Sequence, residues 1–326
     1  TMSKKPKVGM WSGLTAVTAV LTAGAIVGTT VAFHYTTTVN NYLDADTYKI
    51  IRGDSDEDTE YFKSDFTSDE ERESYEAELC AQVEAEGAAL LKNDNNALPL
   101  ASGAKVSLFG HVSVDLMYGG TGSGSVDTSK APNFKQALED QGIQVNSTLW
   151  DLYSSDDMMK NYSRITPAAI SDTLEANTQY AVNEAPWSKL SSAESSFADY
   201  GDAAIVVFSR SGGEGADLPS GENGTNDSWI KGQEGDGNYL ALSAEEKELL
   251  QNLKTLKDNG TFKKIIVLIN SSNAIEMDFL NPEICGEDYG IDSAMWIGDV
   301  GQTGINGVAQ LLAGEVTPSG SLVDSY

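Results

Sequence analysis

Two glycine-rich stretches contain the residues of this sequence that are best suited to chemistry. The first is YGGTGSGSVD, residues 118–127, with four glycines in ten residues. The second is SRSGGEGADLPSGENGTNDSWIKGQEGDGNYLALS, residues 209–243, which includes Glu214. Glycine lets a ligand approach the backbone closely, and a carboxyl group can give or accept a proton. These residue types predict either a phosphate-binding loop or acid/base chemistry on a polar ligand.

The spacing in the first stretch excludes the two common phosphate-binding loops. A Walker loop, GxxxxGK[ST], needs a lysine directly after its last glycine, and Lys130 lies too far along the chain. A dinucleotide-binding loop, GxGxxG, needs a third glycine where Ser125 stands, and it must follow its strand directly. We therefore expect residues 118–127 to line a site for a neutral polar ligand. A flexible surface loop is the alternative.

The second stretch places acidic residues between glycines. More than thirty residues without periodicity are typical of a functional or disordered segment. Glu214 lies in SGGEG, where small neighbours leave its carboxyl group uncovered. Such a group on a closing loop suits general-acid catalysis, because its pKa rises as water leaves. Any single acid among the 49 is more often a solvent-facing side chain, so this argument needs support from the rest of the chain.

The charge of the chain argues against nucleic acid as a partner. The formal net charge is −28, and the only charged side chains among the first 35 residues are Lys4, Lys5 and Lys7. The rest of the chain therefore carries −31, and its basic residues are scattered. A body this acidic repels nucleic acid and anionic lipid, and its acidity serves solubility.

Few residues are available as soft metal ligands. The sequence has two cysteines, Cys80 and Cys285, and two histidines, His34 and His111, without the spacing of a zinc site. One disulfide between the two cysteines is the alternative to two free thiols. We expect no metal and no cofactor.

The amino terminus predicts a membrane span. Residues 8–33 contain no charged side chain, and about 20 apolar residues suffice to cross a bilayer as a helix. Lysines before this run and acidic sequence after it predict a cytoplasmic amino terminus and an extracellular body, in a single-pass cell-membrane protein. A cleavable signal peptide is the alternative, although its apolar core is usually shorter. We expect a tail and anchor over 1–35, and an acidic stem over 36–67.

Apolar periodicity predicts the elements that position the two glycine-rich loops. Near-continuous apolar runs separated by helical patterns indicate an α/β fold, with a mostly parallel sheet and helices on both faces, over residues 68–326. Such sheets bind ligands at the carboxyl ends of their strands. The expected strands are 105–110, 202–209, 263–271 and 293–298, and the expected helices are 68–91, 133–142, 243–260 and 303–314.

The order of these segments resembles the α/β-sandwich domain of family 3 glycoside hydrolases, the β-glucosidase and β-xylosidase group. Each segment alone is weakly specific, and the ordered set over about residues 84–322 is specific. The segments are LLKNDNNALPL, KVSLFG, YGGTGSGSV, DAAIVVFSRSGGEGADLP, EGDGNYLALS, KKIIVLINSSNAIEM, AMWIGDVGQTGINGVAQLLAGE and TPSGSL.

The resemblance implies a retaining β-glycosidase that hydrolyses oligosaccharides with two carboxyl groups. In the family an Asp nucleophile lies on a (β/α)₈ barrel, and a loop of the sandwich domain often supplies the acid/base Glu. Glu214 matches that Glu in SGGEG, with Glu222 and Glu234 as alternatives. Tyr239, in the same loop, is either a sugar-stacking ring or part of the loop packing. The resemblance implies a sugar-binding surface that includes Gly120, Gly122, Ser123, Trp229, Glu234 and Asp236.

The sequence departs from the family pattern in three respects. Gly237 stands where relatives commonly have Arg. An anchor and stem precede the sandwich, which fits the inverted order known in the family, with the barrel second. No barrel lies within these residues, and Lys63-Ser64-Asp65-Phe66 is rejected as a nucleophile segment because it precedes a capped helix. Three explanations are ranked in order of preference. The sequence is the amino-terminal part of a longer enzyme, or the barrel is a separate chain, or the domain has lost catalysis. A non-catalytic, anchored carbohydrate-binding or assembly module is the competing hypothesis.

Overall fold

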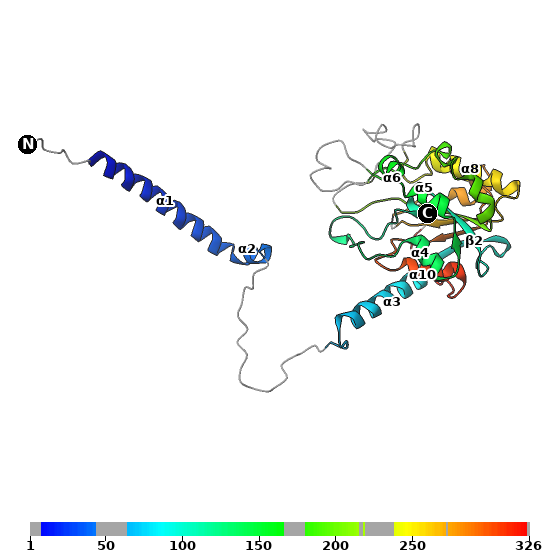
Figure 1. Ribbon diagram of the computed structural model, residues 1–326, viewed down its shortest axis with the longest axis horizontal. Coiled ribbons are helices and arrows are strands. Elements are labelled where there is room, and N and C mark those ends of the chain that lie inside the picture. The colour runs from blue at the N-terminus through cyan, green and yellow to red at the C-terminus, as the bar shows by residue number, and fades with distance from the viewer. Residues whose placement is uncertain are drawn as a thin grey trace, which may run out of the picture. The chain divides into compact units, whose positions relative to one another are not determined.

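The computed structural model comprises two compact units, Thr1–Asp65 and Phe66–Tyr326, which are described separately. Figure 1 shows the elements of both units. The residues that the structure describes are 8–43, 64–165, 180–214, 218, 238–271 and 273–324.

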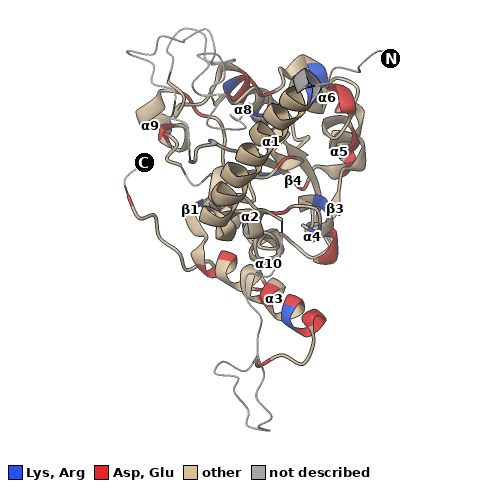
Figure 2. Cartoon of the chain, turned by 90° about the vertical axis from the view of Figure 1, so that its left-hand side faces the viewer, with Lys and Arg blue, Asp and Glu red and all other residues tan. Residues whose placement is uncertain are grey.

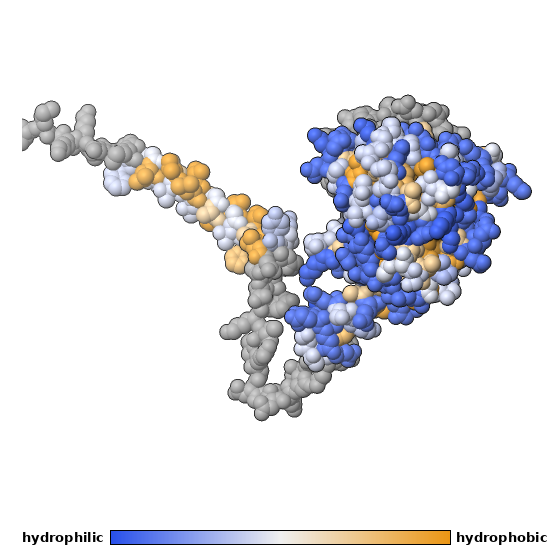
Figure 3. Space-filling view, turned by 45° about the vertical axis from the view of Figure 1, so that its right-hand side comes forward, coloured by the Kyte–Doolittle hydropathy of each residue, from blue (hydrophilic) through white to orange (hydrophobic). Residues whose placement is uncertain are grey.

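The first unit contains two helices, α1 (Val8–His34) and α2 (Thr36–Tyr42). Trp11–His34 is long and apolar enough to cross a membrane, a test that a signal sequence also passes. Exposed apolar side chains line this helix (Figure 3). The hydroxyls of Thr15, Thr18 and Thr30 donate to the carbonyl four residues earlier, so these polar groups are satisfied within the helix. The predicted long apolar helix is present, and its length and composition suit either a membrane anchor or a signal sequence.

The second unit is built on a six-stranded sheet with the order β1-β6-β5-β4-β2-β3. All neighbouring strands are parallel except β1, which runs antiparallel to β6 at one edge. The predicted α/β fold with a mostly parallel sheet is confirmed. The strands are β1 (Ala89–Asn93), β2 (Lys105–Phe109), β3 (Gln144–Val145), β4 (Ala203–Phe208), β5 (Ile265–Ile269) and β6 (Ser293–Trp296).

Helices cover both faces of this sheet, as predicted. The second-unit helices are α3 (Asp69–Gly87), α4 (Phe134–Asp140), α5 (Ser147–Tyr153), α6 (Asp156–Asn161), α8 (Ala244–Asp258), α9 (Pro282–Cys285) and α10 (Ile305–Ala313). In Figure 1, α4 and α10 lie on one side of the strands and α5 and α8 on the other. Acidic side chains strongly outnumber basic ones on α3 (Figure 2).

The central strands are buried on both faces, which explains their continuous apolar sequences. In β4, Ile205 and Val207 pack in one core with residues of α4 and α10. Val206 and Phe208 pack in a second core with residues of α5 and α8. Alternate side chains of a strand point to opposite faces, so a strand covered on both sides must be apolar throughout.

The predicted helix over 68–91 ends too late. Helix α3 stops at Gly87, and Ala89–Asn93 forms β1 along β6. Leu90 and Leu91 have high helix propensity, so the local sequence does not separate them from the helix. The pairing with β6, some two hundred residues away in sequence, decides the strand.

Candidate active site

The loops after β2, β4, β5 and β6 meet at one edge of the sheet. Asn270, fully buried after β5, connects three of them. Its amide nitrogen donates to the carbonyls of Met117 (3.0 Å) and Gly298 (2.6 Å), and its Oδ1 accepts from the amide of Met117 (2.6 Å). This side chain fixes the segment that leads from β2 into the first glycine-rich loop. Nothing in the sequence pattern distinguished Asn270 from other loop asparagines.

The two glycine-rich loops predicted to form the site lie against each other. Glu214 Oε2 accepts hydrogen bonds from the amide of Ser123 (2.9 Å) and from its hydroxyl (2.8 Å). The hydroxyl of Thr121 donates to the backbone carbonyl of Glu214 (3.1 Å). Gly122, Ser123 and Glu214, three of the residues chosen from the sequence, are therefore in one place.

Glycine is required at the contact between these loops. Gly122 has φ +65°, and a Cβ there would collide with the Glu214 side chain. A Cβ on Gly213 would collide with Thr121. Gly120, by contrast, has open space where a Cβ would lie. The glycines at 122 and 213 thus allow close approach of one loop to the other, whereas no neighbour requires glycine at position 120.

The hydrogen bonds from Ser123 favour the ionised form of Glu214. The Ser123 amide and then the Ser123 hydroxyl lower the pKa of Glu214 below the ordinary glutamate value, and desolvation acts in the opposite direction. The exposed Glu214 side chain is therefore an ionised carboxylate in this arrangement. A raised pKa of Glu214, as expected when a closed site excludes water, is not found here, where its pKa is lowered.

A buried arginine joins the two ends of the second glycine-rich loop, which we call its neck. The guanidinium of Arg210, which is 0% exposed, donates to both carboxylate oxygens of Glu246, at 2.9 and 2.7 Å. It also donates to the carbonyls of Ser209 (2.7 Å), Tyr239 (2.6 Å) and Ala241 (2.5 Å), so all five N–H groups are used. The ends of the stretch 209–243 are therefore held together, and Glu214 lies four residues beyond this anchor.

Tyr239 belongs to the same neck and is not available to stack on a sugar. Tyr239 is 1% exposed, and the guanidinium carbon of Arg210 lies over its ring, 5.8 Å from the ring centroid. Its hydroxyl donates to the carbonyl of Ser211 (2.9 Å), and burial raises its pKa far above the ordinary tyrosine value. Of the two roles considered for Tyr239, the structure supports loop packing.

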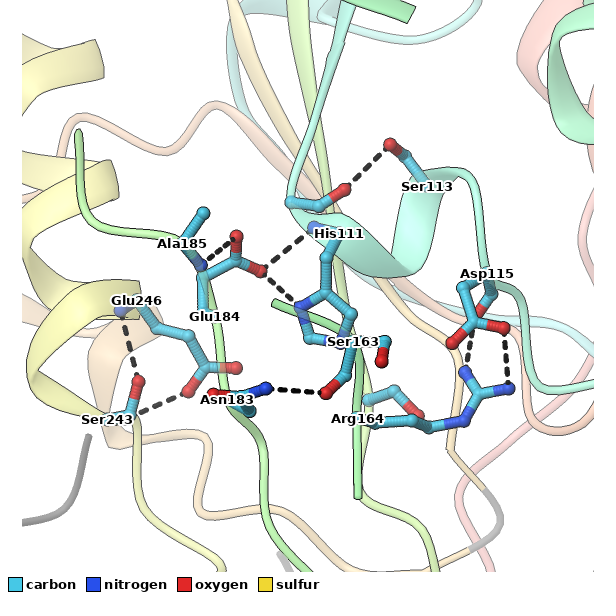
Figure 4. Close-up of polar contacts among 12 residues, drawn as sticks. His111, Ser113, Asp115, Ser163, Arg164, Asn183, Glu184, Ala185, Ser243 and Glu246 are labelled. Carbon is cyan, nitrogen blue, oxygen red and sulfur yellow. Dashed lines mark hydrogen bonds and ion pairs between the residues drawn. The ribbon is translucent and has the colours of Figure 1, made fainter. Parts of the chain in front are cut away.

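A buried histidine–glutamate pair holds the chain directly after β2. Glu184 Oε2 lies 2.8 Å from His111 Nδ1 and accepts from the His111 amide (2.9 Å), while Oε1 accepts from the amide of Ala185 (2.9 Å). Figure 4 shows Glu184 between these two partners. Both side chains are at least 96% buried. Seventy-three residues separate the pair in sequence, so no local motif predicted it.

A polar cleft of about 520 Å³ opens at the other end of the first loop. Gln302, from the loop after β6, donates to the carbonyl of Asp127 (2.8 Å) across it. The lining residues are Arg72, Glu73, Glu76, Ala77, Cys80, Asp127, Lys130, Gln302 and Thr303. The first loop thus contacts Glu214 within its glycine-rich part and borders a hydrophilic hollow where it ends.

Several residues chosen from the sequence are not placed at this site. Trp229, Glu222, Glu234 and Asp236 lie outside the described residues, as does Gly237. Cys80 and Cys285 are both free thiols, so the alternative of a disulfide between them is wrong. Within the ranges that the structure describes, His, Cys, Asp and Glu form no group of three suited to a metal ion.

Comparison with known proteins agrees with the fold. Residues 88–326 match the glycosyl hydrolase family 3 C-terminal domain. The chain is 31% identical over 251 residues to a β-glucosidase of Ruminococcus albus, and 30% identical over 266 residues to β-glucosidase A of Butyrivibrio fibrisolvens. Each alignment covers 76% of this chain but only 22% and 28% of the relative. The chain therefore spans about a quarter of the length of these relatives.

Solved structures show the same fold. A β-glucosidase from Paenibacillus barengoltzii superposes with a TM-score of 0.55 and 27% identity, over 74% of this chain and 23% of that one. β-Glucosidase 3B from Thermotoga neapolitana, in complex with glucose, gives a TM-score of 0.54 at 23% identity, over 76% and 30%. The chain belongs to glycoside hydrolase family 3, and residues 88–326 form its C-terminal domain.

Proposed function

We propose that this chain is the sandwich portion of a membrane-anchored, β-glucosidase-like retaining β-glycosidase acting on oligosaccharides. Glu214 is its acid/base residue. The nucleophilic Asp comes from a (β/α)₈ barrel supplied by a further segment or another chain. Support comes from the β-glucosidases to which the chain is similar and from the position of Glu214 within residues 88–326, which match the family model.

The observation that carries the proposal is the contact between Glu214 and the first glycine-rich loop. Two loops from the carboxyl edge of a parallel sheet, where such folds bind ligands, converge on one exposed carboxylate. The neck formed by Arg210 and Glu246 gives the loop that bears Glu214 a fixed base. A general acid/base needs such placement at the surface that receives the substrate.

In the proposed reaction Glu214 acts twice. It first protonates the leaving glycosidic oxygen while the barrel carboxylate attacks the anomeric carbon. As a carboxylate it then accepts a proton from the water that hydrolyses the glycosyl-enzyme. Gly120, Gly122 and Ser123, with Trp229, Glu234 and Asp236, would form the adjoining sugar-binding surface.

Helix α1 would hold this domain at the cell membrane, with its body outside. The support is its length and apolar composition, together with Lys4, Lys5 and Lys7 before it. Alkaline extraction of membranes tests this, because an anchored chain stays in the pellet and keeps its amino-terminal residues by mass spectrometry. A chain shortened by the apolar run would indicate a signal sequence instead.

The catalytic assignment is tested by three matched variants of the full-length gene product. Glu214→Gln should lower hydrolysis of a β-glucoside by about 10²- to 10⁴-fold, the range typical of a lost acid/base group. Glu222→Gln should retain activity within a few-fold, and Glu234→Gln, which alters the proposed sugar-binding surface, should lose much less activity than Glu214→Gln. If one of them is the inactive variant, the acid/base assignment moves to that residue. Turnover should be absent from the 326-residue chain alone, because double displacement needs two carboxyl groups.

A non-catalytic carbohydrate-binding or assembly role is the second candidate. It is favoured by one observation, the two hydrogen bonds that Ser123 donates to Glu214, because they favour the carboxylate, which accepts hydrogen bonds from sugar hydroxyls. Under this alternative, Glu214→Gln weakens glucoside binding in calorimetry, and no form of the full-length gene product shows turnover.

A further inference from the structure

We propose that Ser123 is a positioning residue that selects which oxygen of Glu214 transfers the proton. It holds Oε2 and leaves Oε1 to the reaction. The catalytic consequence rests on the proposed function of Glu214, whereas the geometry of the contact does not.

The two donors of Ser123 bind the same carboxylate oxygen. The amide and the hydroxyl lie 2.9 and 2.8 Å from Oε2. Among the described residues Oε1 has no hydrogen-bond partner. An oxygen that accepts two hydrogen bonds is a poor site for a proton, so Oε1 is the atom that gains and loses it.

The backbone of Glu214 is held at the same contact, which fixes the direction of its side chain. The Thr121 hydroxyl donates to the Glu214 carbonyl (3.1 Å), and Gly213 packs on Thr121 too closely for any side chain. A carboxylate bound at one oxygen and at its own main chain keeps a single orientation. Proton transfer in both halves of a retaining reaction can then use one unchanged oxygen, because the bonds to Oε2 persist in the acid and the carboxylate forms.

Among the described residues, no charged side chain contributes to the pKa shift of Glu214. Residues 118–126 are uncharged. In the loop of Glu214, the cation of Arg210 is turned inward and paired with Glu246. Ser123 lowers the pKa of Glu214 through both of its hydrogen bonds, and desolvation opposes this shift. Replacing one hydroxyl should therefore have a clear effect.

The contact is tested without any assay of activity. The detergent-solubilised chain is labelled with ¹³C at glutamate carboxyls and titrated by NMR, with Glu214→Gln identifying the signal of Glu214. In Ser123→Ala the titration midpoint of Glu214 should move up by about half a pH unit, because one charge-assisted hydrogen bond to an exposed carboxylate is lost. Ser123→Thr keeps the hydroxyl and should restore the midpoint. Ser125→Ala, which removes a hydroxyl from the same loop, should leave it unchanged.

An unchanged midpoint in Ser123→Ala, or an equal change in Ser125→Ala, would overturn the proposal. The catalytic consequence is measured in the full-length gene product. There the alkaline limb of the kcat/KM profile should move to higher pH in Ser123→Ala and return in Ser123→Thr. Full activity of Glu214→Gln would remove the proposed function of Glu214 and leave the NMR result standing, so the two failures are distinguishable.

Discussion

Arg210 and Glu246 form a bidentate ion pair, with N···O distances of 2.9 and 2.7 Å, at the point where the stretch 209–243 leaves and rejoins the body. Both side chains are almost completely buried, at 0% and 1% exposure. Glu246 also accepts from the amide of Ser243 (2.8 Å) and so completes the capping box of α8. One carboxylate therefore joins the beginning of the loop of Glu214 to the start of the following helix.

We expect Glu246→Gln to lower the free energy of unfolding by about 3 kcal/mol, because it leaves a buried guanidinium without its counter-charge. Urea denaturation measures this change. Glu139→Gln is the control, since its pair with Lys135 is long, at 3.9 Å, and partly exposed. That variant should change stability by less than about 1 kcal/mol. Equal, small effects of both changes would show that the buried pair does not hold the neck of the loop.

Glycine at position 122 is predicted to be indispensable to the contact with Glu214. Gly122→Ala places a methyl group against the Glu214 side chain at φ +65° and should lower stability by about 1 kcal/mol or displace Glu214. In the NMR titration, displacement would appear as a higher midpoint for Glu214.

The matched control for this change lies two residues earlier. Gly120→Ala adds the same methyl group in open space, so both thermal unfolding and the Glu214 titration should match the wild type. If the two alanine variants behave alike, the close approach of the two loops is not what requires glycine at position 122.

The stability of the sandwich should fall with rising pH because of Glu84 on α3. Burial, with a smaller contribution from Asp299, raises the pKa of Glu84 from 4.5 to about 8. Its Oε1 is buried without a hydrogen-bond partner in the described part of the chain. Between pH 4.5 and 8 the unfolded chain releases this proton while the folded chain keeps it. The folded state therefore loses stability through this window.

Glu84→Gln removes this titration, so it should stabilise the domain at pH 8 more than at pH 5. We expect a difference of about 2 kcal/mol, well below the full value of such a shift, because the side chain is only partly buried. Glu86→Gln, on the exposed side of the same helix, is the control and should show no comparable difference. A stability gain from Glu84→Gln that is independent of pH would contradict the assignment.

The sequence predicted the features that depend on local pattern. The runs AAIVVF and IIVLI of β4 and β5 are apolar throughout because both faces are covered, and the Ser243 capping box marks the start of α8. The contact of Gly122 and Ser123 with Glu214 agrees with the choice of both loops as one site. The apolar strands and the capping box need no knowledge of distant partners.

The features that were missed depend on contacts between distant segments. Arg210 stands in a Ser- and Gly-rich stretch typical of an exposed loop. Its partner Glu246 lies 36 residues away in sequence, so no local pattern indicates that the two side chains pair. The same holds for the pair of His111 and Glu184 and for the hydrogen bonds of Asn270, because each joins segments that are far apart in sequence. The helix predicted over 68–91 includes the first residues of β1, whose partner β6 lies near the other end of the chain.

The central claim is that Glu214 gives a proton to the leaving group, and dependence on that group tests it most directly. The full-length gene product and its Glu214→Gln variant are compared on a dinitrophenyl β-glucoside and on cellobiose, under conditions where glycosylation of the enzyme is measured. The account predicts a loss of about 10²- to 10⁴-fold on cellobiose, whose leaving alcohol needs protonation, and little loss on the activated phenolate. Equal losses on both substrates, or none on either, would contradict the acid/base role of Glu214.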